Sequence, residues 1–166
     1  MQRLCCKIRG MASRSVIAAV LFAVLGIAPP WAGCAHAALG GEAAGVLADA
    51  AELRGVVNTE LRQQYDIEDI SAESGMRVRE YLSRDGVVFA VSWSGPVMPD
   101  LQRLLGTHFA KYAAALKALT HPGLQRSVRV ASADLIVESG GHLRAYAGRA
   151  YLPALIPAGV SEAEIL

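Results

Sequence analysis

A β-hairpin centred on Asp85-Gly86 is the clearest feature of the pattern of apolar and polar positions. The run Val87–Val91 is apolar on both faces of a strand, which is typical of a central strand covered by helices. Asp-Gly is favoured in a two-residue type I′ turn, because both central positions of that turn need a positive φ. Such a turn pairs Leu82 with Phe89, Glu80 with Val91, and Val78 with Trp93.

The register of this hairpin depends on the length of its loop. A three-residue loop, 84–86, pairs Tyr81 with Phe89 and Arg79 with Val91, and it moves the side chains of the incoming strand to the other face. We favour the two-residue loop because it groups the apolar side chains of the two strands. Its cost is that Glu80 lies on an apolar face, where its carboxyl group needs a partner.

The rest of the chain alternates between helical and strand periodicity. Helices are expected over residues 42–54, 99–106 and 107–119, with the Thr107 hydroxyl capping the third. Strands are expected over 65–70, 76–83, 87–93, 126–131, 134–139 and 142–151. Residues 55–64 are polar and predict a connection, while Gly140-Gly141 predicts a tight turn.

These elements predict an α+β domain. Its sheet is antiparallel with about five or six strands, which is an ordinary sheet size. A helical hairpin is expected between the two groups of strands, and its helices pack on the sheet through an apolar stripe from Phe109 to Leu116. A β-sandwich without helices is the alternative architecture.

Residues 1–37 have the three parts of a secretory signal peptide. Basic residues precede an apolar run from Val16 to Ala28, and Ala35-His36-Ala37 follows as an A-x-A cleavage site. Cleavage between Ala37 and Ala38 leaves a single mature globular domain, 38–166. Lipidation at Cys34 is the less favoured alternative. The protein is therefore expected to be exported to the periplasm or the medium.

Removal of this segment changes the charge and the cysteine content. The chain carries 16 Lys and Arg against 15 Asp and Glu. Residues 1–37 contain four of the basic residues and none of the acidic ones, so the mature domain is mildly acidic. Such a domain does not favour nucleic acid, which attracts a basic surface. All three cysteines precede Ala38, so the mature domain is cysteine-free. It also has no apolar run long enough to be a transmembrane helix.

A set of short segments carries a family resemblance. These segments are Arg79–Tyr81, Gly86–Trp93, Gly95-Pro96, Pro99–Leu101, Leu104–Gly106, Ser139–His142 and Gly148–Pro153. Together they resemble a family of exported bacterial proteins, domain-of-unknown-function family 2844, over essentially the whole mature domain. The resemblance implies an exported protein without an assigned activity, and it transfers no catalytic residue to this chain.

Few residues of the mature domain suggest catalysis. It has no cysteine nucleophile, no phosphate-binding glycine loop and no histidines spaced to chelate a metal, so neither a metal nor a cofactor is expected. If the protein is an enzyme, the catalytic candidates are Glu80, His142 and Arg149. If Glu80 is buried beside Arg79 or Arg149, we expect it to form a structural ion pair, and an acid of raised pKa is the less favoured alternative.

Ligand binding has its own candidates, which are Arg79, Trp93 and His142. Arg79 shares a strand face with Arg77 and Tyr81, and an arginine–aromatic row suits an anionic or sugar-like ligand. Trp93 ends the central strand beside a Gly-Pro loop, where ligand contacts are common. His142 follows the glycine pair of the expected turn.

Export and the absence of a clustered nucleophile, base or metal set predict a non-enzymatic binding or accessory module of the cell envelope. Its partner is an envelope protein or a small ligand. One alternative is a small envelope hydrolase or carbohydrate-active enzyme, in which Glu80 or His142 meets another polar side chain inside a pocket. The other is a structural or assembly factor that acts through an exposed sheet edge.

Overall fold

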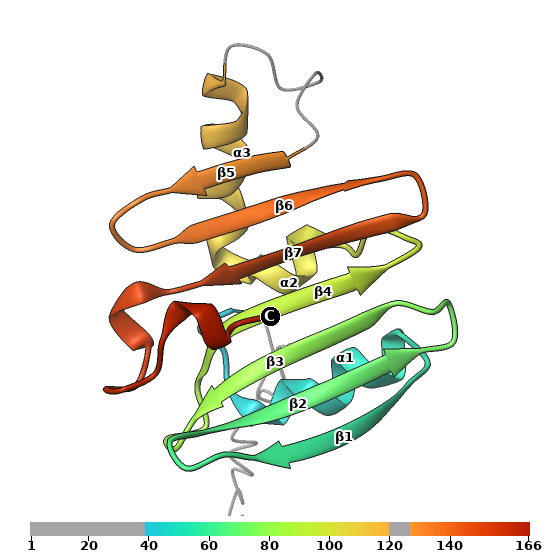
Figure 1. Cartoon of the computed structure of the whole chain (residues 1–166), viewed down its shortest axis with the longest axis vertical. Coiled ribbons are helices and arrows are strands. Elements are labelled where there is room, and N and C mark those ends of the chain that lie inside the picture. The colour runs from blue at the N-terminus through green and yellow to red at the C-terminus, as the bar shows by residue number, and fades with distance from the viewer. Residues whose placement is uncertain (1–38, 120–126) are drawn as a thin grey trace, which may run out of the picture. The chain divides into compact units, whose positions relative to one another are not determined.

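The computed structural model describes residues 39–119 and 127–166, which all belong to the compact unit Ala32–Leu166. The central element of this unit is one antiparallel sheet. Its seven strands follow the order β1-β2-β3-β4-β7-β6-β5 (Figure 1). They are β1 Gly55–Leu61, β2 Tyr65–Ala72, β3 Arg77–Ser83, β4 Val88–Gly95, β5 Ser127–Ala131, β6 Ile136–His142 and β7 Ala145–Tyr151. The fold is α+β, as predicted, but the sheet has seven strands rather than five or six.

The additional strand is β1, which the sequence indicated as a connection. It pairs with β2 along its whole length, from Gly55 opposite Ala72 to Leu61 opposite Asp66. It lies at the edge of the sheet, and most of its side chains are exposed, Val56 and Leu61 among them. A strand with little buried surface needs no apolar alternation, so its sequence reads as a polar loop.

Three α-helices cover one face of the sheet (Figure 1). They are α1 Val46–Glu52, α2 Leu101–Leu105 and α3 Phe109–Ala118, and the last two follow one another between β4 and β5. Val46 of α1, Leu105 of α2 and Tyr112 of α3 share one core with inward-facing strand residues. That α2 and α3 form a hairpin stays a prediction. We call the helix-covered side of the sheet the helix face and the opposite side the open face.

A side chain caps α2, whereas the cap expected for α3 is not formed. The Asp100 carboxylate caps α2 by accepting hydrogen bonds from the main-chain N–H groups of Gln102, at 2.9 Å, and Arg103, at 3.3 Å. Thr107 does not cap α3, because it lies inside a short 3-10 helix, Gly106–His108, that leads directly into α3. The apolar stripe of α3 does pack on the core through Phe109 and Leu116, both half-buried.

The β3–β4 hairpin combines both predicted registers. Its turn is a three-residue loop, since Ser83 N–H donates to Val87 O at 2.9 Å and Leu82 pairs with Val88. The preference for a two-residue loop was therefore wrong at the turn, although Gly86 has the expected positive φ of 75°. Phe89 is then an extra residue in β4, and beyond it Glu80 faces Val91 and Val78 faces Trp93, as the two-residue loop predicted.

A bulge at Phe89 has a packing reason. It lets Phe89 and Ala90, which are consecutive, both join the apolar cluster on the open face, while Val88 and Val91 join the core under the helices. A regular strand would send Phe89 and Ala90 to opposite faces, and a bulge removes that restriction.

The β6–β7 turn lies further along the chain than the glycine pair predicted. Gly140 and Gly141 are inside β6, opposite Ala147 and Tyr146, and His142 pairs with Ala145. The turn consists of Leu143 and Arg144, and Arg144 takes a φ of 66°. The expectation that Gly140-Gly141 forms the turn is therefore wrong. Gly140 instead leaves the open face of β6 without a side chain.

Candidate ligand-binding site

The open face of the sheet is built from three parallel rows of side chains that run across the strands. Strand pairing places Ile67, Tyr81, Ala90, Tyr151 and Ile136 in the first, which we call the apolar row. It places Asp69, Arg79, Ser92, Arg149, Glu138 and Arg129 in the second, the charged row. It places Ser94, Ala147, Gly140 and Ser127 in the third, the small row, with Arg77 next to Ser94.

The apolar row is covered by the C-terminal segment, residues 152–166 (Figure 1). Ile165 is fully buried in a cluster that includes Tyr81 and Tyr151. The Tyr81 hydroxyl donates to the Leu166 main-chain oxygen at 2.7 Å, and the Tyr151 hydroxyl donates to the Glu162 carboxylate at 2.7 Å. Ile165 and Leu166 lie beside the charged row, and no other residue of the segment lines the space over the charged and small rows, which we call the uncovered rows.

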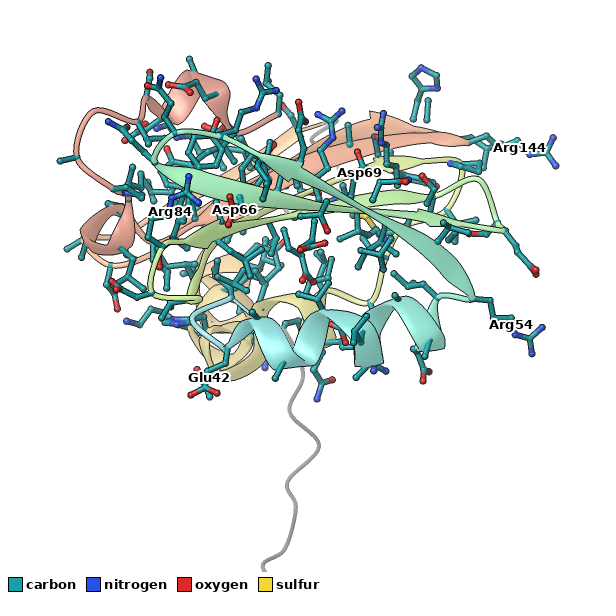
Figure 2. All side chains as sticks on the ribbon, turned by 90° about the horizontal axis from the view of Figure 1, so that it is seen from below. Glu42, Arg54, Asp66, Asp69, Arg84 and Arg144 are labelled. Carbon is teal, nitrogen blue, oxygen red and sulfur yellow. The ribbon has the colours of Figure 1, made fainter. Side chains whose placement is uncertain are left out.

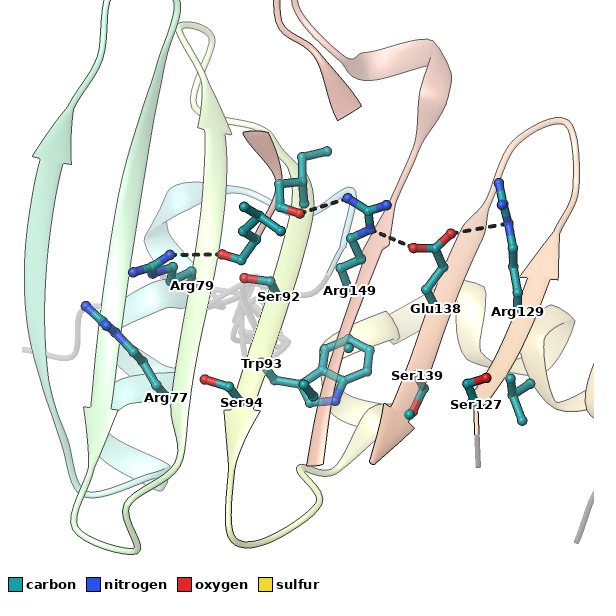
Figure 3. A pocket seen from close by; sticks show the side chains of 16 residues that line it. Arg77, Arg79, Ser92, Trp93, Ser94, Ser127, Arg129, Glu138, Ser139 and Arg149 are labelled. Carbon is teal, nitrogen blue, oxygen red and sulfur yellow. Dashed lines mark hydrogen bonds and ion pairs between the residues drawn. The ribbon is translucent and has the colours of Figure 1, made fainter. Parts of the chain in front are cut away.

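A pocket of about 900 Å³ lies over the uncovered rows. Its floor is low because Ser94, Ala147 and Gly140 have small side chains or none, whereas arginines rise around it (Figure 3). The end of the C-terminal segment, Ile165 and Leu166, forms one wall. The pocket thus results from small residues at successive cross-strand positions of the open face.

Carboxylates hold the four arginines of the pocket in place. Asp69 accepts from Arg77 Nε at 2.7 Å and from Arg79 Nε at 3.0 Å. Glu138 lies between Arg149 and Arg129, with its oxygens 2.8 Å and 3.2 Å from their respective Nε atoms. Burial works to raise the pKa of Asp69, but hydrogen bonds and charge from Arg77 and Arg79 outweigh burial and hold that pKa below its usual value.

The terminal nitrogens of two arginines face the C-terminal segment as well as the pocket. Arg79 Nη1 donates to the Leu166 main-chain oxygen at 2.9 Å. Arg149 Nη1 donates to the main-chain oxygens of Glu162, at 2.8 Å, and Ile165, at 3.1 Å. Among residues 39–119 and 127–166, no acceptor is hydrogen-bonded to Nη2 of either arginine, so both can donate to a ligand.

Three of the predicted site residues meet at this pocket. Arg79 and Arg149 belong to the charged row, and Arg77 and Tyr81 lie on the same face as Arg79, as the strand parity predicted. Trp93 reaches the pocket from the helix face: it is only 3% exposed, and its indole ring lies against Gly148, which has no side chain to separate them. Trp93 is therefore mainly a core residue beneath the pocket floor.

His142 and Glu80 do not line the pocket. His142 is exposed beside the β6–β7 turn, two residues beyond Gly140 of the pocket floor, and it is not among the residues that line the pocket. Glu80 lies on the helix face, so the ion pair with Arg79 or Arg149 considered for it is not formed.

Glu80 is instead a buried acid between β3 and α1. It is fully buried, and neither of its oxygens has a hydrogen-bond donor among the described residues. Burial, together with the negative charges of Asp49 and Glu68, raises the pKa of Glu80 to about 9. At this pKa Glu80 keeps its proton in the folded protein and can donate it to Asp49, which also accepts from Arg103 Nε at 3.0 Å. The raised-pKa interpretation of Glu80 agrees with this geometry.

Fold and site define a class: a seven-stranded α+β domain with an arginine-rich pocket on the open face of its sheet. The chain belongs to the family described as "Protein of unknown function (DUF2844)", which matches residues 35–165, so the family resemblance is confirmed. No curated protein and no solved structure matches the chain. In the part of the chain that the structure describes, no helix has the length and apolar character needed to cross a membrane.

Proposed function

We propose that the protein is an exported, non-enzymatic binding module of the cell envelope and that the pocket on its open face binds an anionic ligand. The observation that supports this proposal is the charge of the pocket. Four arginines line or border it against two side-chain carboxylates, Asp69 and Glu138, and both carboxylates are already paired with arginines. The groups that remain for a ligand are therefore mostly N–H and O–H donors.

The donors in the pocket suit carboxylate, phosphate or sulfate groups. A guanidinium offers a planar fork that matches the geometry of such oxyanions. Ser92, Ser94 and Ser127 add hydroxyl donors between the arginines. Because each Nε is fixed by a carboxylate, the arginine side chains lose little further conformational freedom when a ligand binds.

The lining of the pocket favours binding over catalysis. None of its lining residues is a histidine, cysteine or lysine. Its Glu138 is held between Arg149 and Arg129, so both of its oxygens already have charged partners. In residues 39–119 and 127–166 no group of three acidic, histidine or cysteine side chains is placed to hold a metal ion. The two acid–base candidates from the sequence, Glu80 and His142, lie elsewhere.

Export is the first testable part of this proposal. The signal peptide and its cleavage site, Ala37-Ala38, lie outside the described residues, and the expectation depends on their sequence. Protein recovered from the periplasm or the medium of expressing bacteria is expected to begin at Ala38, as read by N-terminal sequencing. An intact Met1, or a lipidated Cys34, would contradict this expectation.

Anion binding is the second part, and Trp93 supplies its reporter because its ring lies beneath the pocket floor. Addition of polygalacturonate or polyglutamate to exported protein is expected to change Trp93 fluorescence for at least one of the two polyanions. Dextran, which is neutral, should leave the fluorescence unchanged. The change should weaken as salt is added, because the interacting charges are partly exposed.

A substitution that fills the pocket separates specific binding from general attraction. Ala147→Leu adds bulk to the floor without changing charge, and it is expected to lower the affinity for the polyanion at least about tenfold. Ala145→Leu is the matched control, since Ala145 is also exposed on β7 but does not line the pocket. If neither polyanion binds, or if Ala147→Leu binds as well as Ala145→Leu, the proposed function is wrong.

A further inference from the structure

We propose that the ligand of the pocket is a linear acidic glycan, a chain of sugar units that carry carboxylates, lying across the strands along the small row. This inference rests on the proposed function, namely that the pocket binds an anion. It adds the shape of the ligand, the spacing of its charges and the chemistry of its backbone.

The shape follows from the strands that contribute to the pocket. Its lining residues come from five neighbouring strands, β3, β4, β7, β6 and β5, as well as from Ile165 and Leu166. Neighbouring strands lie about 4.8 Å apart, so the backbones of β3 and β5 are separated by roughly 19 Å. A ligand that uses the whole pocket is therefore long and narrow and runs perpendicular to the strands.

The spacing of charge follows from the positions of the arginines. Arg77 and Arg79 lie on β3, Arg149 on β7 and Arg129 on β5, so guanidinium groups recur on every second strand of the pocket (Figure 3). Between them, β4 contributes Ser92 and Ser94, while Glu138 of β6 fixes two of the arginines. Positive charge thus recurs about every 10 Å across the sheet, which matches a polymer with regularly repeated negative charges.

The chemistry of the floor favours a glycan over an acidic peptide. A peptide that binds to a sheet usually pairs its main chain with an exposed edge strand. The pocket lies over the face of the sheet, where the backbone groups of β4, β7 and β6 are already paired with neighbouring strands. Only side chains are available there. Sugar hydroxyls and carboxylates need only side-chain partners, and Ser94, Ser127 and the arginines supply them.

The two ends of the pocket have the most accessible arginines. The side chains of Arg77 and Arg129 are 51% and 64% exposed, against 33% for Arg79 and 25% for Arg149. Their loss should disturb the fold least, and it should remove one charge at each end of the pocket, a pair that only a long ligand reaches at once. These two positions therefore distinguish a long ligand from a short one.

The test is a titration of exported protein with galacturonic acid oligomers from the monosaccharide to the hexasaccharide, followed by Trp93 fluorescence and calorimetry. Each further ion pair raises the affinity by less than about tenfold, because exposed ion pairs are weak. Several such pairs together should make the hexasaccharide bind about tenfold more tightly than the disaccharide. In Arg77→Gln/Arg129→Gln the advantage of the hexasaccharide should fall to about twofold.

Arg54→Gln/Arg144→Gln is the matched control for charge. Both arginines are exposed at turns outside the pocket and project away from the sheet (Figure 2), and the same two charges are lost. This variant should keep the full dependence on length. Melting temperatures of both double variants establish that they are folded.

Two results with the unmodified protein would each overturn the inference and leave the proposed function standing. One is equal affinity for the disaccharide and the hexasaccharide, which would mean that the ligand is a short anion. The other is binding of hexaglutamate with at least the affinity of the hexasaccharide, which would assign an acidic peptide. If Arg77→Gln/Arg129→Gln and Arg54→Gln/Arg144→Gln behave alike, the ligand does not span the pocket, and the inference fails.

Discussion

Glu80→Gln is expected to raise the free energy of unfolding by about 3 kcal/mol at about pH 7. Most substitutions of a fully buried residue destabilise a protein, so the predicted sign is unusual. It follows from the position of Glu80 in the core between β3 and α1, next to Asp49 and directly opposite Glu68. Glutamine keeps the shape of the side chain and can donate an N–H to Asp49, but it carries no ionisable group.

The physical reason is that folding forces Glu80 to keep its proton. The pKa of Glu80 is about 9 in the folded protein, against an ordinary value of 4.5. Between these two values the unfolded chain has lost the proton and the folded protein holds it. The free energy of unfolding therefore falls by about 1.4 kcal/mol for each pH unit as pH rises through this window. From 4.5 to about pH 7 this loss amounts to about 3 kcal/mol, which glutamine avoids.

Denaturant unfolding as a function of pH measures this effect. The wild type and Glu80→Gln should have similar stability near pH 4, where the carboxyl group is protonated in both folded and unfolded states. Their difference should grow as pH rises toward about 9. Glu68→Gln is the matched control: Glu68 is in the same cross-strand row but half-buried and hydrogen-bonded to Thr59.

Glu68→Gln should change stability by less than about 1 kcal/mol, since its carboxylate is only half-buried. Loss of its charge removes one of the smaller causes of the raised pKa of Glu80, so most of the pH dependence due to Glu80 should remain. A Glu80→Gln protein that is less stable than the wild type at about pH 7, with no pH dependence in the difference, would show that Glu80 is ionised and paired in the folded state. A protonated Glu80 in the folded protein would then be excluded.

Local features of the fold could be predicted from the sequence because they depend on neighbouring residues. Gly86 has a positive φ because an Asp-Gly turn requires one, and Val78 lies opposite Trp93 because apolar side chains of one hairpin pack together. The bulge at Phe89 could not be predicted. It depends on Tyr65, Tyr151 and Ile165, which complete the apolar cluster from distant parts of the chain. β1 was missed because an exposed edge strand has little apolar pattern.

The pocket depends on a pairing that the sequence does not report. Ser92 lies opposite Arg149, and Arg149 lies opposite Glu138, because β4 pairs with β7 and β7 with β6. Parity along a single strand was enough to group Arg77, Arg79 and Tyr81 on one face. It could not indicate that Glu138 and Arg129 continue the row that begins at Asp69. That glycine and alanine occupy successive cross-strand positions, and so form a pocket floor, can be inferred only when the strand register is known.

Gly148→Ala is expected to lower the free energy of unfolding by about 2–3 kcal/mol, the usual cost of overpacking a core. Gly148 of β7 lies opposite Trp93 of β4 on the helix face. A Cβ atom at position 148 would lie 2.3 Å from Cζ2 and 2.6 Å from Cε2 of Trp93, and 2.6 Å from the main-chain oxygen of Glu138. The indole can move only into a packed core, and the Glu138 oxygen is fixed by the ladder between β6 and β7.

The same substitution should report on the pocket, because Trp93 lies beneath its floor. The emission of Trp93 is expected to shift to longer wavelength as the ring is displaced from its buried site. Gly140→Ala is the matched control: Gly140 is also a strand glycine without positive φ, but its Cβ would point into the pocket. Gly140→Ala should cost less than about 1 kcal/mol and leave the emission unchanged.

A double-mutant cycle then identifies the clash. In Gly148→Ala/Trp93→Phe, the smaller ring leaves room for the new methyl group, so the combined loss should be smaller than the sum of the two single losses. If the two losses of unfolding free energy are instead additive, the methyl group clashes with the main chain of Glu138 rather than with Trp93. If Gly148→Ala is as stable as the wild type, the indole ring does not lie against Gly148, and Trp93 cannot serve as the reporter of the pocket.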